Sequence, residues 1–309
     1  MATNDRFDSF LTENVREDQI LRAIASASTG QGGVQVGPGD DAAVLVPVES
    51  PLVVSVDQCI EGLHFLPETP LGDVGVKAVR RAAGDLAAMA ASPIALVATA
   101  LLPKSMTHRE ALLLYEAIRD ESKRLGCPLV GGDTCIKHRE SDSGIHLTVT
   151  VLGTAACPVL RSGAKIGDRL CVTGPLGGSF VSGRHLYPPV RISEALQLST
   201  QLGDDLHAMI DISDGLGKDA MAVASSSNAR IILDARSIPC HSGFNWEDAI
   251  VDGEDHELLF AVGEHADFSN LPFQVSEIGK VTEGDPAVLV SSPDGLQIDV
   301  SERGWNHGA

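Results

Sequence analysis

The chain has 309 residues, of which 43% are hydrophobic, and a formal net charge of −19. This length exceeds the usual size of one domain, and the apolar content is sufficient for two α/β domains of about 150 residues each. The acidic balance argues against a nucleic-acid partner, because binding to a phosphate backbone needs clustered lysine and arginine side chains.

The cysteines and the N-terminus indicate a cytoplasmic protein. None of the six cysteines has C-x-x-C spacing, and most lie in apolar runs, which is typical of buried thiols in a reducing compartment. Residues 1–18 are polar and acidic and lack the basic and apolar regions of a signal peptide. The uncharged stretch 86–102 is shorter than a membrane span and is interrupted by Ser92-Pro93, so we predict no membrane segment.

The first half of the chain alternates strand and helix patterns. A short amphipathic helix is predicted over 18–27, followed by a glycine-rich linker over 30–33. The strands predicted for this half are 34–36, 42–47, 52–57, 94–101, 128–130 and 145–153. The predicted helices are 74–91, followed by a turn at Pro93, and 108–125, which Gly126 ends.

The polar, turn-rich segment 154–167 is the predicted boundary between a domain over 1–153 and a domain over 154–309. The second domain has a predicted helix over 216–224. Its predicted strands are 169–173, 230–234, 258–262 and 275–281. Alternating strands and helices predict an α/β or α+β fold.

Six aspartates lie in short segments where an apolar or glycine-rich stretch meets a predicted sharp turn. They are Asp40, Asp57, Asp85, Asp133, Asp211 and Asp214. One aspartate beside a glycine is typical of a surface turn, but several at the ends of predicted buried strands indicate a shared site. Carboxylate oxygens suit Mg²⁺, which also binds substrate phosphates. The pattern therefore predicts one metal-bound phosphate site.

Three candidate residues keep an ordinary structural alternative. Asp85 lies in a predicted helix one turn after Arg81, so an i,i+4 ion pair is as consistent with the sequence as a metal role. A lone histidine such as His64 is more often structural, although it follows Asp57 closely enough to contact a substrate. Glu254 precedes an apolar strand, where an acidic surface turn is the default.

The familiar nucleotide signatures are absent, since Gly217-Lys218 is followed by Asp219 and lacks the upstream glycine of a P-loop. At Gly131-Gly132-Asp133, backbone N–H groups of a glycine turn would face a phosphate while the carboxylate binds the metal. No Ser-His-Asp order or activated cysteine indicates a covalent intermediate. The sequence therefore favours direct phosphoryl transfer, which depends mainly on positioning and charge neutralisation.

Seven blocks, in order between Gly37 and His307, resemble the thiamine-monophosphate kinase family, which uses ATP to convert thiamine monophosphate to thiamine diphosphate. The blocks are 39–44, 61–65, 84–89, 131–134, 161–164, 210–216 and 253–258. The resemblance implies the two-domain aminoimidazole ribonucleotide synthetase-like fold, of mixed α/β class. It also implies a homodimer in which the sheets of the first domains pair.

The resemblance further implies roles for individual residues. Several Mg²⁺ ions would be held by Asp40, Ser55, Val56, Asp57, Asp85, Asp133, Asp211 and Asp214, of which Asp57, Asp133 and Asp214 are assigned to catalysis. The residues in contact with ATP would be Gly132, Asp133, Arg161 and Ser213. Thiamine monophosphate would contact His64, Glu254 and Trp305. A phosphate oxygen of that substrate would attack the γ-phosphorus of ATP in line.

Five positions depart from the family pattern. Val56 stands where threonine is common, so only its backbone carbonyl remains as a ligand. Gly84 replaces a serine and Cys135 replaces a threonine. Asp252 replaces a glycine and His256 a tyrosine. These changes bear on substrate fit and rate more than on reaction class. Two other functions stay open: a related ATP-using enzyme with another substrate, and a catalytically weak or silent Mg–nucleotide-binding dimer.

Overall fold

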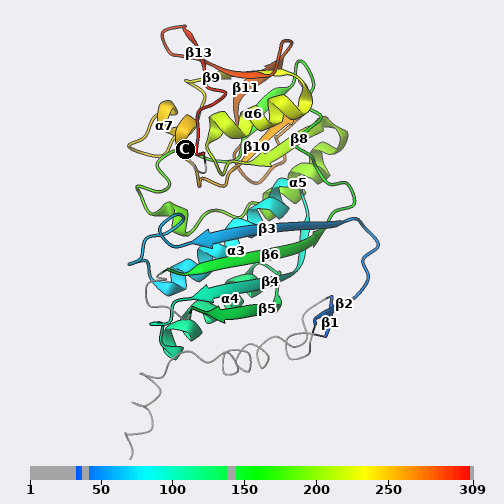
Figure 1. The fold of residues 1–309 in the computed structure, drawn as a ribbon. Helices are drawn as coiled ribbons and strands as arrows, with labels where there is room; N and C mark the ends of the chain where they lie inside the picture. The colour runs from blue at the N-terminus through cyan, green and yellow to red at the C-terminus, as the bar shows by residue number, and fades with distance from the viewer. Residues whose placement is uncertain (1–32, 37–41, 138–143, 307–309) are drawn as a thin grey trace, which may run out of the picture. The chain divides into compact units, whose positions relative to one another are not determined.

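The computed structural model describes residues 33–36, 42–137 and 144–306. The chain divides into two compact units (Figure 1). The first unit comprises Met1–Ala83 and Pro93–Thr154, and the second comprises Gly84–Ser92 and Ala155–Ala309. Helix α3 (Leu71–Ala88) therefore contributes residues to both units.

The first unit is built on a four-stranded sheet with the order β3-β6-β4-β5. Its strands are β3 (Leu52–Ile60), β6 (His146–Thr154), β4 (Ser92–Leu102) and β5 (Leu129–Ile136). The β3–β6 pair is antiparallel and the β4–β5 pair is parallel. Helices α3 and α4 (His108–Arg124) lie over one face of this sheet (Figure 1). Strands β1 (Val34–Val36) and β2 (Val44–Leu45) form a separate antiparallel pair.

Helix α4 follows the sequence prediction because both of its ends carry local signals. Thr107 and Glu110 form a reciprocal capping box at its start. Gly126, with φ of 69°, follows its last turn in a left-handed conformation that glycine adopts without steric cost. The predicted helix over 108–125 is confirmed.

The predicted ends of several strands of the first unit are wrong. Strand β4 begins at Ser92 and includes Pro93, which was expected to form a turn before it. Strands β3 and β5 run beyond their predicted ends, so Asp57 and Asp133 lie within strands and not at sharp turns. Pairing with neighbouring strands supplies backbone hydrogen bonds that local turn propensity cannot anticipate.

At Gly132, strand β5 packs so closely against β4 that only glycine fits. A Cβ atom at Gly132 would lie 1.9 Å from the carbonyl oxygen of Ala98 on the parallel strand β4. Glycine therefore permits a close approach of two strands here, as it does where backbones must come together. The predicted glycine turn at 131–132 is replaced by this strand contact.

The second unit is built on a seven-stranded sheet with the order β13-β12-β9-β11-β7-β10-β8. The strands are β7 (Arg169–Val172), β8 (Leu206–Asp211), β9 (Arg230–Asp234), β10 (Leu258–Val262), β11 (Ser276–Thr282), β12 (Ala287–Ser291) and β13 (Gln297–Asp299). The helices are α5 (Ile192–Leu202), α6 (Leu216–Ser227) and α7 (Trp246–Val251), with short 3₁₀ turns η1 (Arg184–Leu186) and η2 (Gly203–Asp205). The four predicted strands are confirmed, whereas β12, β13 and α7 were not anticipated.

Both faces of this sheet are covered by apolar clusters, which is why its central strands are apolar throughout. On β10, Leu259 belongs to the cluster that contains Leu216 and Val223 of α6. The adjacent Phe260 belongs to the opposite cluster, which contains Leu198 of α5. The mixed α/β class expected from the sequence is confirmed. Among the described residues, no helix is both long and apolar enough to cross a membrane.

Candidate functional site

The Asp211–Gly215 turn of the second unit is held by a carboxylate that the predicted site did not include. Strand β8 ends at Asp211, as predicted. Backbone N–H groups of Ser213, Asp214 and Gly215 then donate to Oδ2 of Asp219 at 3.0, 2.9 and 3.1 Å. Asp219 lies in the first turn of α6 and is only 6% exposed. It therefore fixes the backbone that carries two predicted site residues.

Asp219 lies in a strongly perturbed electrostatic environment. Burial, followed by the negative charge of Asp211, raises the pKa of Asp219 to about 8, although the backbone donors act in the opposite direction. The sequence signal for its role was an acidic side chain in the first turn of a helix, where backbone N–H groups lack intrahelical partners. At the level of the sequence, Asp219 is only a residue that does not fit the P-loop pattern and is assigned no role in the site.

A strained segment over 252–257 lies beside this turn. Glu254 and His256 both have left-handed backbones, with φ of 67° and 51°. The Glu254 N–H donates to the Ser213 carbonyl at 2.8 Å, and the His256 N–H donates to the Ile212 carbonyl at 2.7 Å. Left-handed non-glycine residues are costly and persist where surrounding contacts enforce them, often at functional sites. These bonds bring the predicted substrate residue Glu254 next to the predicted ATP residue Ser213.

The His256 side chain connects two predicted site carboxylates. Its Nδ1 atom lies 3.2 Å from Oδ2 of Asp211, and its Nε2 atom lies 3.7 Å from Oε2 of Glu254, which is an ion-pair distance longer than a hydrogen bond. The imidazole is buried. Burial lowers the pKa of His256, but Asp211 and then Glu254 outweigh it and raise the pKa to about 9.

Gly84 and Asp85 of α3 lie next to this cluster within the second unit. A Cβ atom at Gly84 would lie 3.5 Å from Nδ1 of His256 and 3.6 Å from Oδ2 of Asp211. Two of the departures from the family pattern, Gly84 and His256, are therefore neighbours. Asp85 follows Gly84 directly on the helix and is half-buried.

Trp305 lies beside Asp214, although the two residues are far apart in the sequence. The Trp305 N–H donates to the Asp214 carbonyl at 2.8 Å. Lys218 of α6 lies 2.7 Å from Oδ2 of Asp214 and donates to the Trp305 carbonyl at 2.5 Å. The indole is half exposed. The second unit thus brings together five predicted residues: Asp211, Ser213, Asp214, Glu254 and Trp305.

Asp252 and Asp255 support the strained segment from the other side. The Gly178 N–H donates to Oδ2 of Asp252 and the Gly177 N–H donates to Oδ2 of Asp255, both at 2.7 Å. Asp252, which replaces a glycine of the family pattern, therefore binds the backbone of the neighbouring loop at Gly178. Asp255 also lines a hollow of about 460 Å³ with Arg184 and Tyr187. Burial raises the pKa of Asp255 to about 6.

Arg161 is exposed on the segment that enters the second unit. The carbonyl of the preceding Leu160 accepts a hydrogen bond from the Met209 N–H at 2.9 Å. This bond places Arg161 near β8, the strand that ends at Asp211. The exposed guanidinium is a charged donor of the kind that pairs with phosphate.

In the first unit, Asp57 and Ser55 point to the helix-covered face of β3. Their cross-strand partners on β6 are Val149 and Val151, both buried, and such partners share a face. Val56 points to the opposite face and is 60% exposed, so only its backbone can face the same side as Asp57. The Nη2 atom of Arg81 lies 3.4 Å from Oδ1 of Asp57.

Asp133 and His64 occupy different surroundings. Thr134 hydrogen-bonds Tyr115 of α4, so by strand alternation the exposed Asp133 points away from that helix. Asp57 and Asp133 therefore lie on opposite faces of their sheet. His64 is buried, and its Nδ1 atom accepts the Ile60 N–H at 3.0 Å. This contact agrees with the structural alternative for His64.

The predicted metal ligands do not form a complete site within the part of the chain that the structure describes. There, no group of three or more His, Cys, Asp or Glu side chains is arranged to hold a metal ion. Asp40 lies outside the described residues. Of the other predicted ligands, Ser55, Val56, Asp57 and Asp133 belong to the first unit and Asp85, Asp211 and Asp214 to the second.

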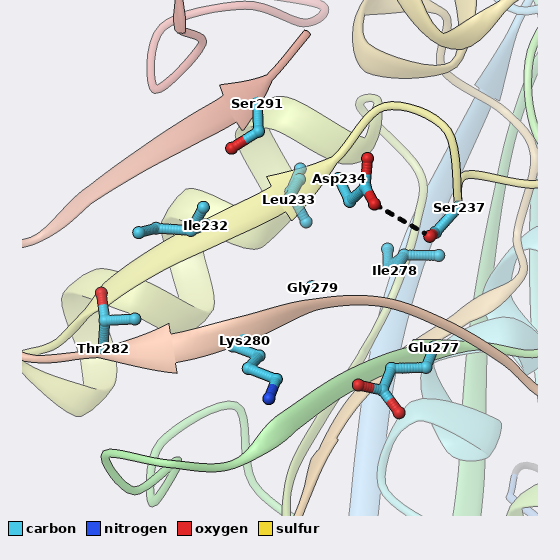
Figure 2. A pocket seen from close by; sticks show the side chains of 10 residues that line it. All are labelled: Ile232, Leu233, Asp234, Ser237, Glu277, Ile278, Gly279, Lys280, Thr282 and Ser291. Carbon is cyan, nitrogen blue, oxygen red and sulfur yellow. Dashed lines mark hydrogen bonds between the residues drawn. The ribbon is translucent and has the colours of Figure 1, made fainter. Parts of the chain in front are cut away.

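A second hollow, of about 560 Å³, lies on the sheet of the second unit (Figure 2). Its walls come from β9, β11 and the end of β12, and Lys280 and Glu277 provide charged groups. It contains none of the predicted site residues. The cluster around Asp211 is therefore a better candidate site than this hollow.

Comparisons with known proteins agree with the architecture. Residues 39–155 match the family model described as AIR synthase related protein, N-terminal domain. The chain is 34% identical to the thiamine-monophosphate kinase of Rhodopirellula baltica, over 86% of this chain and 89% of that protein.

Solved structures also resemble it. The thiamine-monophosphate kinase of Stenotrophomonas maltophilia has a TM-score of 0.78 and 26% identity, covering 93% of this chain and 99% of that one. The structure of AaThiL complexed with AMPPCP and TMP has a TM-score of 0.74 and 27% identity, covering 87% and 91%.

Proposed function

Because the chain belongs to the thiamine-monophosphate kinase family, we propose that it transfers the γ-phosphoryl group of ATP to thiamine monophosphate. The observation that carries the proposal is the cluster of Asp211, Ser213, Asp214, Glu254 and Trp305. It combines carboxylates for a metal–nucleotide complex with residues assigned to the acceptor. The similarity to a protein complexed with AMPPCP and TMP supports the same two substrates.

We propose that several Mg²⁺ ions act in this reaction. Asp57, Asp133, Asp211 and Asp214 offer hard carboxylate oxygens, the donors that suit Mg²⁺. The ions would neutralise the negative charge of the phosphate oxygens. Asp40, Ser55, the Val56 carbonyl and Asp85 are the further ligands in the proposal.

The chain's own residues would orient the two substrates. Arg161 presents an exposed guanidinium to an ATP phosphate, and Ser213 lies on the turn fixed by Asp219. Trp305 offers an exposed aromatic face to the cationic ring of thiamine monophosphate. Glu254 adds a carboxylate to the acceptor side, whereas a contact from the buried His64 would require its ring to be uncovered.

The test is incubation of the purified protein with MgATP and thiamine monophosphate, followed by chromatography of the products. Thiamine diphosphate and ADP should form in equal amounts, and chelation of Mg²⁺ should stop their formation. If folded enzyme forms no thiamine diphosphate, the assignment is wrong. Nucleotide binding without turnover of any monophosphate would then favour the silent-module alternative.

We also propose a cytoplasmic homodimer that pairs through the sheet of the first unit. Leu52, Val54 and Val56 alternate along one face of β3 and are 51%, 56% and 60% exposed. Such a row of apolar side chains is typical of a protein–protein contact. Light scattering should give twice the chain mass for the wild type and a monomer mass for V54E. A wild-type monomer at micromolar concentration would contradict the dimer.

A further inference from the structure

The imidazole of His256 lies between a predicted metal ligand, Asp211, and a predicted acceptor residue, Glu254. Its two nitrogen atoms face different partners, with Nδ1 toward Asp211 and Nε2 toward Glu254. The ring is buried at 3% exposure, so water does not screen these contacts strongly. Nδ1 can therefore fix Asp211 by a hydrogen bond, whereas Nε2 attracts Glu254 as a longer ion pair.

The backbone around His256 makes this arrangement rigid. The His256 N–H bonds the Ile212 carbonyl at 2.7 Å, and the Ile212 N–H bonds the Glu257 carbonyl at 2.8 Å. Glu257 is held in turn by two hydrogen bonds from Arg191, at 2.8 and 2.7 Å. His256 has a left-handed backbone, which is energetically costly for a residue other than glycine. The surrounding hydrogen bonds enforce this conformation and keep the imidazole between Asp211 and Glu254.

We propose that His256 is a positioning residue that holds Asp211 for the metal–nucleotide complex through Nδ1 and holds Glu254 for thiamine monophosphate through Nε2. The inference rests on the proposed function. Hydrogen-bonding partners of metal-binding carboxylates orient them, and their loss typically weakens metal binding about 10- to 100-fold. One imidazole would then support both substrates without touching either.

Two substitutions at position 256 separate the contact with Asp211 from the contact with Glu254. Asparagine places an amide nitrogen near the position of Nδ1 and does not reach Glu254, and it tolerates a left-handed backbone. Glutamine places its amide near the position of Nε2 and leaves Asp211 without its donor. Phenylalanine retains the ring volume and removes both contacts.

The experiment combines steady-state kinetics with calorimetry of Mg–AMPPCP binding for the wild type, H256N, H256Q and H256F. H256N should raise KM for thiamine monophosphate about 10-fold and leave nucleotide affinity nearly unchanged. H256Q should weaken Mg–AMPPCP binding about 10-fold with a smaller effect on that KM, and H256F should change both. Equal effects of H256N and H256Q on both quantities would overturn the proposal.

A matched control is H207N, which alters another His–Asp contact of the second unit, 2.8 Å between His207 Nδ1 and Asp168 Oδ2. It should lower the melting temperature without separating the two affinities. If the wild type does not phosphorylate thiamine monophosphate, the proposed function fails. In that case calorimetry still tests the proposed role of the His256–Asp211 contact. Unchanged Mg–AMPPCP affinity in H256Q would overturn that role.

Discussion

Arg81 Nη2 lies 3.4 Å from Asp57 Oδ1, on the helix-covered face of the first unit's sheet. The sequence had placed Arg81 one helical turn before Asp85, where an i,i+4 pair was the ordinary expectation. The contact with Asp57 joins residues 24 positions apart. An arginine next to a carboxylate partly neutralises it, so Asp57 need not be destabilising when no metal is bound.

We expect D57N to lower kcat on the order of 100-fold, the size of effect seen when an electrostatic contributor to a transition state is removed. Asparagine keeps the shape of the side chain, so the melting temperature should change little. The matched control is D120N, because Asp120 on α4 is exposed and pairs with the adjacent Arg119. Wild-type turnover by D57N would remove Asp57 from the proposed metal ligands.

The D219A substitution should disorder the Asp211–Gly215 turn, because three backbone N–H groups lose their acceptor. We expect the free energy of unfolding to fall by about 1–3 kcal/mol. Mg–AMPPCP affinity should also fall, as calorimetry would measure. D267A is the control, since Asp267 is exposed and its side chain accepts hydrogen bonds from the nearby Ser269. An unchanged affinity in folded D219A would mean that the turn does not bind nucleotide.

Gly132 and Gly131 provide a comparison of neighbouring glycines. In G132A the new Cβ would collide with the Ala98 carbonyl oxygen, whereas in G131A it would make an ordinary 3.8 Å contact with Val97. Urea unfolding should show G132A destabilised by at least about 1–3 kcal/mol and G131A much less affected. Equal stabilities would contradict the close approach of β4 and β5.

Asp255 should contribute to the pH dependence of stability. Its pKa in the folded protein is about 6, above the ordinary value of about 3.9. Between these values the folded state binds more protons than the unfolded state, so this contribution to stability falls as pH rises through this window and is constant above it.

The D255N substitution removes that titration and can keep the hydrogen bond from the Gly177 N–H. Between pH 4 and 6, its free energy of unfolding should therefore decline less steeply with pH than that of the wild type. D299N is the control, because hydrogen bonds from Ser301 lower the pKa of Asp299 and move its titration below this window. Identical slopes for the wild type and D255N would contradict the raised pKa.

The relation between sequence and site differs between the two units. In the second unit, Asp211 stands at the end of an apolar strand and Asp214 directly precedes Gly215, and the structure agrees. In the first unit the same reasoning placed Asp57 and Asp133 at turns, but both lie within strands. A glycine pair is a turn signal only when no neighbouring strand pairs with it, and the parallel neighbour β4 lies far from β5 in the sequence.

The sequence by itself determined the mixed α/β class, the helix over 108–125, most of the central strands and the family, because these depend on local periodicity, capping and ordered motifs. Tertiary structure alone decided which side chains meet. Trp305 against Asp214 and His256 against Asp211 both join distant segments. Such contacts arise from strand pairing and loop closure, whose partners local sequence does not specify.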